Sequence, residues 1–212
     1  MKELIDEFIH EDPNRGKLFL LMIFSNSSTE SKILPPLNHF EFTEANESNY
    51  DGEMQGGKRH GRGKMTFKTG EYYEGEWRDN LMDGYGVLYD GHKNKIYEGH
   101  YSKGKMEGSG ILYNTKRSPS FVSTDHLQIS KIFDFNSENW IKFEGVFKEN
   151  KWEGIGKLYF ANGDMYYGEV REGMLHGNGC LYTEGGQVIS QVWENNRLIV
   201  SDVLATEGAD FE

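Results

Sequence analysis

Cysteine and long apolar runs are scarce in this chain of 212 residues, and each scarcity excludes a class of protein. Cys180 is the only cysteine, so no intrachain disulfide can form, which favours a reducing compartment over secretion. The longest apolar run, residues 18–24, is far shorter than the roughly 20 residues that a membrane-spanning helix needs. The acidic stretch before it lacks the basic region of a signal peptide. These features predict a cytoplasmic protein.

Hydrophobic residues make up only 36% of the chain, too few for a thick core of aliphatic side chains. Glycine, with 26 residues, and aromatic residues, at 14%, are plentiful instead, which indicates a thin core of rings packed over glycines. The net charge of −11 is concentrated at the two ends, because residues 1–49 hold nine acids against four bases and residues 199–212 hold four acids and no base. Binding of nucleic acid needs a basic face, so nucleic acid is excluded as a partner.

A short pattern recurs along the chain: an aromatic residue, a glycine two positions later, and a Gly-x-Gly pair further on. Copies begin at Tyr50, Tyr73, Tyr97, Phe143 and Tyr166, so the steps are 23, 24, 46 and 23 residues. A fixed period of this length indicates an array of small repeated units, and it favours an extended binding surface over a catalytic pocket. The other members of the pattern are Gly52, Gly75, Trp77, Gly99, Gly145 and Gly168 in the first halves, and His60, Gly61, Gly63, Gly84, Gly86, Gly108, Gly110, Gly154, Gly156, His176, Gly177 and Gly179 in the second.

The spacing within each copy predicts a β-hairpin. Tyr73, Gly75 and Trp77 alternate with Glu74 and Glu76, which places the rings on one face of a strand. After a glycine-rich turn, a second strand places one apolar residue of each copy in a common column, which consists of Met65, Leu88, Leu112, Leu158 and Leu181. The paired glycines are expected to supply a positive φ and room beneath a ring of the adjoining strand. We therefore predict an all-β fold: an elongated single-layer array of antiparallel β-hairpins, with a short N-terminal extension that contains a helix.

The chain divides into five segments. Residues 1–49 form the extension, with an amphipathic helix and a docking loop; residues 50–113 hold the first three repeats. Residues 114–142 are either an insertion or a degenerate repeat, and the absence of glycine between Gly110 and Gly145 favours a loop. Residues 143–198 hold two more repeats and a closing half repeat around Trp193, and residues 199–212 are an acidic tail.

The pattern resembles the MORN (membrane occupation and recognition nexus) repeat, over about residues 50–113 and 143–198. Only His60 and His176 keep the histidine of the family pattern, and only Trp77 keeps its tryptophan among the five copies. The resemblance implies an elongated hairpin array that holds proteins together, often in cilia and other cytoskeletal structures. Some members of the family lie at membranes and have been credited with phospholipid binding.

No residue pattern predicts catalysis, a metal or a cofactor. Gly52, Gly57 and Lys58 approach a phosphate-binding loop, but Arg59 stands where a Ser or Thr is needed, and the flanks are strands. The histidines lack metal-ligand spacing. The equivalent places of His60 and His176 favour a structural hydrogen bond over general-base work. A non-enzymatic protein is expected.

Two surfaces are candidates for contact with a partner. A basic strip surrounds the first predicted turn and consists of Lys58, Arg59, His60, Arg62, Lys64 and Lys68. Trp152 and Tyr167 are expected to be exposed aromatic contacts. The favoured function is a scaffold or adaptor subunit of a ciliary, flagellar or other cytoskeletal assembly, with other proteins as partners and a homodimer left open. The alternative is a peripheral module that binds anionic phospholipids, phosphoinositides above all, through the basic strip.

Overall fold

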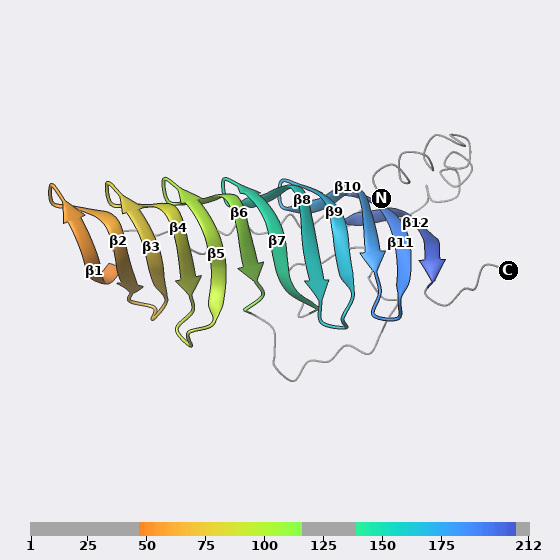
Figure 1. Ribbon diagram of the computed structural model, residues 1–212, viewed down its shortest axis with the longest axis horizontal. Coiled ribbons are helices and arrows are strands. Elements are labelled where there is room, and N and C mark those ends of the chain that lie inside the picture. Colours follow the sequence, from red (N-terminus) through yellow and green to blue (C-terminus); the bar gives the residue numbers. More distant parts are fainter. Residues whose placement is uncertain (1–46, 116–138, 207–212) are drawn as a thin grey trace, which may run out of the picture. The chain divides into compact units, whose positions relative to one another are not determined.

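The computed structural model describes residues 47–115 and 139–206, and their strands form one antiparallel sheet in which order along the sheet equals order along the chain (Figure 1). The predicted hairpin array is confirmed, and no helix occurs in the described residues. The predicted N-terminal helix lies outside them. The strands are β1 (Glu47–Gln55), β2 (Lys58–Phe67), β3 (Tyr72–Arg78), β4 (Leu81–Tyr89), β5 (Lys95–Ser102), β6 (Lys105–Tyr113), β7 (Trp140–Lys148), β8 (Lys151–Phe160), β9 (Met165–Arg171), β10 (Met174–Tyr182), β11 (Gln187–Glu194) and β12 (Arg197–Thr206).

Each hairpin turns through two residues rather than through the paired glycines. Asp79 and Asn80 join β3 to β4 with φ values of 50° and 72°. Two successive positive φ values are characteristic of the type I′ turn, whose twist matches that of the flanking strands. The predicted glycine-rich turn is therefore wrong in position, because the Gly-x-Gly pairs lie inside the second strand of each hairpin.

The two glycines of each pair have different roles. Gly84 has a φ of 110° and lies at an irregularity of the β3–β4 register, where the strand bulges. Gly86 lies under the ring of Tyr73, so a β-carbon there would collide with the phenol. The two predicted reasons for the glycines, positive φ and room for a ring, are thus confirmed.

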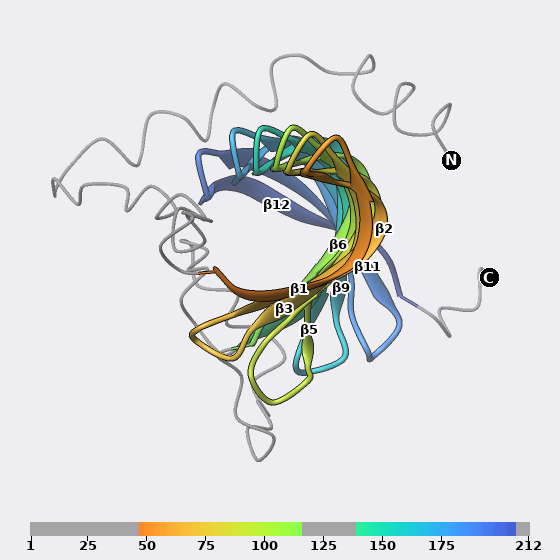
Figure 2. The ribbon, with the colours of Figure 1, turned by 90° about the vertical axis from the view of Figure 1, so that its left-hand side faces the viewer.

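Most of the buried side chains lie on one face of the sheet, which we call the ring face. Tyr73 and Tyr97 are fully buried there, and the predicted column from Met65 to Leu181 is buried throughout. Each tyrosine ring meets its neighbours edge to face, as at the centroid distance of 5.3 Å between Tyr73 and Trp77. The strands are strongly bent, so the sheet follows an arc in cross-section (Figure 2).

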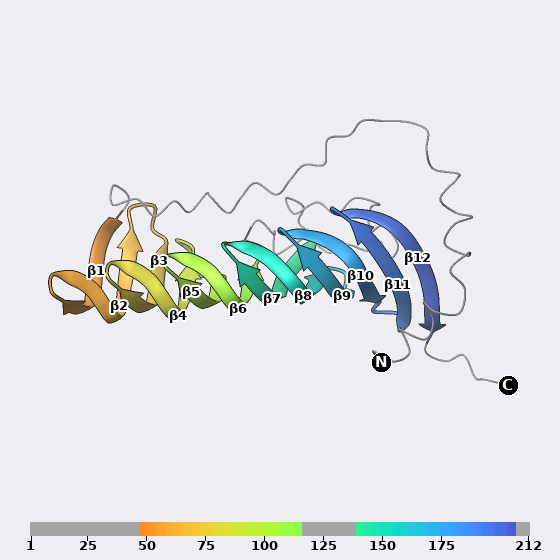
Figure 3. The ribbon, with the colours of Figure 1, turned by 90° about the horizontal axis from the view of Figure 1, so that it is seen from above.

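Hydrogen bonds also connect each turn to the hairpin before it. The backbone N–H of Asn80 donates to the carbonyl of Arg59, and its side-chain oxygen accepts the N–H of Arg59 at 2.8 Å. Asn150 bonds to Met106, and Asn196 to Leu175, in the same two ways. Where a glycine replaces the asparagine, as at Gly104, only the backbone bond is present, to Met82 at 2.8 Å. The hairpins are therefore joined at their turns as well as along their strands, and they succeed one another regularly (Figure 3).

The uncertain segment 114–142 does not interrupt the sheet. β6 pairs directly with β7, and Gly110 lies opposite Gly145 just as Gly86 lies opposite Gly99. Residues 116–138 lie outside the described residues. Whether this segment is an insertion or a degenerate repeat stays a prediction.

The end of the array differs from the prediction of a closing half repeat. β12 pairs with β11 along its length, with Leu198 opposite Trp193, and completes a sixth hairpin. Residues 199–206, which were expected to belong to the acidic tail, are part of this strand. The sequence does not predict the second strand of this hairpin, because β12 lacks the Gly-x-Gly pair. A bulge nevertheless occurs near Trp193.

Candidate functional site

The side chains between the ring-face residues point to the other side of the sheet, which we call the opposite face. In the first and fifth copies, a glutamate on this face caps the glycine bulge. Glu53 accepts the backbone N–H of Arg62 at 2.9 Å, and Glu169 accepts that of Asn178 at 3.1 Å. Glu76 occupies the same place in the second copy, beside Gly84. The opposite face thus carries a repeated row of carboxylates near the bulges.

This acidic row is interrupted in the two middle copies. His100 and Val146 stand where the other copies have glutamate. Val146 is 43% exposed, and its neighbour Ile155 on β8 is 55% exposed. The sequence therefore removes a charge and exposes apolar surface at the same place, which is the opposite of what solubility alone favours.

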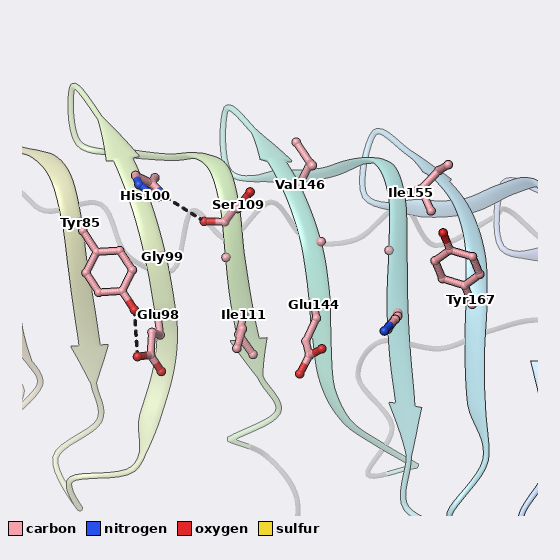
Figure 4. A pocket seen from close by; sticks show the side chains of 14 residues that line it. Tyr85, Glu98, Gly99, His100, Ser109, Ile111, Glu144, Val146, Ile155 and Tyr167 are labelled. Atoms are coloured by element: carbon pink, nitrogen blue, oxygen red, sulfur yellow. Dashed lines mark hydrogen bonds between the residues drawn. The ribbon is translucent and has the colours of Figure 1, made fainter.

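These residues belong to a shallow hollow on the opposite face, over β4 to β9 (Figure 4). The glycine backbone of the strands forms its floor, and exposed tyrosines, Tyr85 and Tyr167, stand toward its two ends. His100 is held there by a bond between its Nδ1 and the Ser109 carbonyl, 3.3 Å apart. We call the apolar part of this hollow the central patch; its members are Tyr85, Ile111, Val146, Ile155 and Tyr167.

Two ion pairs border the central patch. Glu98 accepts from the Lys95 ammonium at 2.6 Å and from the Tyr85 hydroxyl at 2.9 Å. The Lys95 bond lowers the pKa of Glu98 against the opposing effect of burial, and Tyr85 adds to the lowering. Glu98 is therefore ionised at neutral pH, and it fixes the orientation of the Tyr85 ring.

Glu144 forms the second ion pair, with Lys142, and also accepts from the hydroxyl of Tyr159 at 3.1 Å. Burial alone would raise the pKa of Glu144, but the bonds from Lys142 and Tyr159 lower it overall. The border of the patch thus holds two glutamates that are paired with lysines and held in place by tyrosine hydroxyls, and the exposed Lys157 also lines the hollow. An arrangement of this kind is typical of a protein-binding surface, with an apolar centre and a polar rim.

The predicted basic strip does not form one surface. Arg59 points to the ring face, where its guanidinium lies 4.8 Å from the centroid of the Trp77 ring. Lys64 points to the opposite face, bonds to Glu74 at 2.7 Å, and lies over the ring of Tyr72. Lys58 is paired with Asp79 at 3.2 Å. Arg62 and Lys68 are exposed. A flat membrane surface could therefore not meet all the residues of the strip at once.

Trp152 was predicted to be an exposed contact, and this prediction is wrong. Its side chain is 1% exposed, and its ring stacks on that of Phe143 with a centroid distance of 3.8 Å. Trp152 is the second residue of β8, and the residues at that place in other copies, Met82 and Leu175, are buried as well. Comparison of the copies at this place would have identified a core column. Tyr167, by contrast, is 42% exposed and belongs to the central patch.

The repeat pattern of the sequence does not mark Tyr85, Val146 and Ile155 as site residues. A signal was present in the sequence, because Val146 replaces a glutamate that three other copies share. Ile111 and Ile155 gave no such signal, since isoleucine is common on strands.

The other candidate groups have structural surroundings. The Nδ1 atom of His176 is buried without a hydrogen-bond partner, so it does not make the structural bond that was predicted. Cys180 is buried, and burial raises the pKa of its thiol. In the part of the chain that the structure describes, no cluster of three or more His, Cys, Asp or Glu side chains is placed to bind a metal ion. The same part contains no helix long and apolar enough to span a membrane.

Comparison with known proteins identifies the repeats. The family model of the MORN repeat matches residues 50–72, 73–92, 97–116, 143–165 and 166–188. Rat alsin is 28% identical over 165 residues, which are 75% of this chain and 8% of alsin. Human alsin is 26% identical over 164 residues, which are 74% of this chain and 7% of alsin.

The chain thus spans less than a tenth of the length of these curated relatives. The matched ranges together cover just over half of the chain, and each match begins at the first strand of a hairpin in the sheet. The chain belongs to the MORN repeat family.

Proposed function

We propose that this protein is a non-enzymatic scaffold or adaptor that holds another protein at the central patch. One observation supports the proposal above all. His100 and Val146 stand at two positions of the glutamate row, and exposed apolar residues lie around these two positions. An exposed valine and isoleucine on strands of the sheet lose little conformational entropy on binding, so most of the free energy of their burial would contribute to affinity. The repeated fold agrees with a binding role.

The partner would present apolar side chains to the patch and hydrogen-bond donors to its border. Glu98 and Glu144 already accept hydrogen bonds from lysine and tyrosine, so neither carboxylate is unpaired in the free protein. Each could still accept a further hydrogen bond from a partner. We place the protein in the cytoplasm, as a subunit of a ciliary, flagellar or related cytoskeletal assembly. The ciliary or cytoskeletal part of that assignment rests on the resemblance to the MORN family, and the cytoplasmic part rests on the single cysteine and the short apolar runs.

The test is photo-cross-linking of the full chain in native cells, with a photoreactive residue at Ile155. Adding Val146→Lys should reduce the recovered amount of cross-linked partner proteins by about tenfold or more, because a charge would then be buried at the contact. Met54→Lys is the matched control, since Met54 is 57% exposed on β1, far along the sheet from the patch. Equal recovery with both lysine variants, at equal thermal stability, would exclude the patch as the docking site.

A second candidate function, binding to anionic lipid, rests on Lys58, Arg62 and Lys64, which lie on the opposite face of β2. Each base near a membrane surface would contribute about 1 kcal/mol, and salt would weaken that contribution. Co-sedimentation with vesicles that contain phosphatidylserine and phosphoinositide tests it. Binding that is abolished by Arg62→Glu and by high salt would support this candidate, and no binding at low salt would eliminate it.

A further inference from the structure

The hollow that holds the central patch is a trough across the strands, and backbone forms its floor. Four glycines lie opposite one another from β5 to β8, namely Gly99, Gly110, Gly145 and Gly156. Side chains two residues apart on each strand form the two walls, with Val146 above the glycines and Glu144 below them in Figure 4. At about 4.8 Å per strand, the trough is about 24 Å long from β4 to β9, and its walls are about 7 Å apart.

This shape favours one kind of polypeptide. The strands from β4 to β9 are each paired on both sides, so no further strand can be added to them. A helix, about 10 Å across, would rest on the walls without reaching the floor. A polyproline II chain is thinner, and three of its residues rise about 9.3 Å, close to the 9.6 Å or so of two strand spacings. Exposed tyrosines such as Tyr85 and Tyr167 are the side chains on which Pro-rich segments dock.

The chain itself contains such a segment, outside the described residues and shortly before β1. Its sequence is Ile-Leu-Pro-Pro-Leu, over residues 33–37, and it includes the only two adjacent prolines of the chain. Proline fixes φ at about −65°, and a residue that precedes proline avoids the helical region, so this sequence favours polyproline II. The segment is apolar and uncharged, as are the five members of the central patch.

We propose that residues 33–37 bind in this trough of their own chain, with Leu37 near Tyr85 on β4 and Lys32 beside Glu144 on β7. Residues 32 to 37 span about 16 Å as polyproline II, and β4 and β7 are about 14 Å apart. Glu144 accepts two hydrogen bonds within the sheet. A carboxylate has sites for about four, so Glu144 can accept another from the Lys32 ammonium.

The length of chain between this segment and β1 agrees with that orientation. Residues 38–46 join the segment to Glu47, the first residue of β1. A flexible linker of this length has a root-mean-square span of about 17 Å, and β1 and β4 are about 14 Å apart. In the reverse orientation the linker would have to cover the roughly 29 Å from β1 to β7, which needs an almost fully extended chain. A linker matched to its span gives a millimolar effective concentration, so a weak contact fills the trough.

The docked segment would regulate the function proposed above, on which this consequence rests. A partner that binds the central patch must first displace residues 33–37, so its apparent affinity falls by the fraction of chains in which the trough is filled. Leu34→Asp places a charge in the docked segment and should empty the trough. In native cells, with a photoreactive residue at Ile155, this variant should capture about threefold more partner protein than the wild type.

The docking is tested on the purified full chain, with a photoreactive residue at Ser109, which is exposed on β6. At about 1 μM, far below the effective concentration of a tethered segment, we expect adducts with residues 32–37 of the same chain. Lys105, exposed at the turn end of the same strand, is the control position and should give none. Leu34→Asp should lower the adduct about tenfold, whereas Phe40→Asp, which places the same charge in the linker, should retain it.

Three results would overturn the docking: no adduct with residues 32–37, an equal adduct in Leu34→Asp, or adducts between isotopically light and heavy chains in a mixture. Capture of partners at Ile155 in cells, without the adduct in the purified chain, would refute the docking and leave the proposed function standing. The adduct without any captured partner, in the wild type and in Leu34→Asp, would refute the proposed function alone. The adduct with equal capture by both would refute the regulation.

Discussion

The phenol ring of Tyr73 lies over Gly86 of the neighbouring strand, so close that a β-carbon built on Gly86 would overlap the hydroxyl oxygen. The hydroxyl donates to the carbonyl of Glu76 at 3.1 Å, which holds the ring in this position. The same contact recurs between Tyr97 and Gly110. The glycine is thus required for space, since the φ of Gly86 lies outside the left-handed region.

Gly86→Ala should therefore destabilise the protein by about 1–3 kcal/mol, because the added methyl must displace a fully buried ring. The control is Gly91→Ala, in the loop between β4 and β5. An added β-carbon there meets the backbone of Gly70 at an ordinary 3.7 Å, and a change within about 0.5 kcal/mol is expected. Urea unfolding measures both, and equal losses would show that the ring contact does not explain the conserved spacing of the pattern.

Much of the ring face could be predicted from the sequence because period-2 alternation and a fixed repeat specify the same faces. Tyr73, Trp77 and Leu88 are buried as the alternation requires. The turns were misplaced because positive φ was assigned to glycine alone, whereas Asp79 and Asn80 also adopt it. Asparagine and aspartate tolerate this conformation better than other non-glycine residues.

The candidate site was less predictable, because it depends on departures from the repeat rather than on the repeat itself. Val146 is recognised as a site residue only by comparison with Glu53 and Glu169, the equivalent residues of other copies, whose carboxylates cap bulges. The sequence predicts that Arg59 is a surface base, but its guanidinium packs over the ring of Trp77 on the ring face. The roles of Val146 and Arg59 both depend on contacts between different hairpins. The number of charges along the chain carries no information about such contacts.

The stability of the sheet should fall at acid pH through Glu98 and Glu144. The Lys95 and Lys142 ammonium groups hold the pKa of these carboxyls below the ordinary value of 4.5 in the folded protein. A lowered pKa in the folded state contributes stability that is fully present above the unfolded value. That contribution is lost as the pH falls through the folded value. We expect a decline in the free energy of unfolding below about pH 5, of no more than about 1 kcal/mol for each pair.

Urea unfolding as a function of pH measures this decline in the wild type and in Glu98→Gln plus Glu144→Gln. The double variant should be less stable at neutral pH and lose less on acidification. Asp51→Asn, which removes an exposed carboxylate from β1, serves as the control and should follow the wild-type profile. Parallel profiles for the wild type and the double variant would mean that these pairs do not contribute to the pH dependence.

Arg59 should act as a core residue rather than as a surface charge. Its guanidinium lies over Trp77, at the place that Met82 and Met106 occupy in the next two copies. Arg59→Met should leave the free energy of unfolding within about 1 kcal/mol, whereas Arg59→Glu should cost about 1–3 kcal/mol by placing an acid over the ring.

The control for Arg59 is Arg62→Glu, on the opposite face of the same strand. Arg62 is exposed, and its bond to Glu53 is made by the backbone N–H, which the substitution retains. Because Arg62 lies opposite Glu76 on β3, the substitution places two like charges side by side, and we expect a loss of no more than about 1 kcal/mol. If the two glutamate variants were equally unstable, net charge rather than the ring contact would be responsible.

The bonds between successive hairpins offer a way to stabilise the protein. Asn150 joins its turn to Met106 by two bonds, through its N–H at 3.1 Å and its side-chain oxygen at 2.7 Å. Gly104 makes only the first of these, to Met82. Gly104→Asn should add the second and raise the free energy of unfolding by about 0.5–1.5 kcal/mol. Asparagine accepts the positive φ of 82° at this place, and its β-carbon would lie 3.9 Å from Leu81.

Two further variants separate the amide from the rest of the side chain. Gly104→Ala introduces the same β-carbon without an acceptor, so only the strain of positive φ remains and the protein should lose stability. Asn150→Gly keeps the turn conformation but removes the acceptor, and should lose about as much as Gly104→Asn gains. If Gly104→Asn lowered the free energy of unfolding, as Gly104→Ala should, the asparagine amide would not stabilise the contact between hairpins. The bonds of Asn80, Asn150 and Asn196 would then be a consequence of the sheet and not a source of its stability.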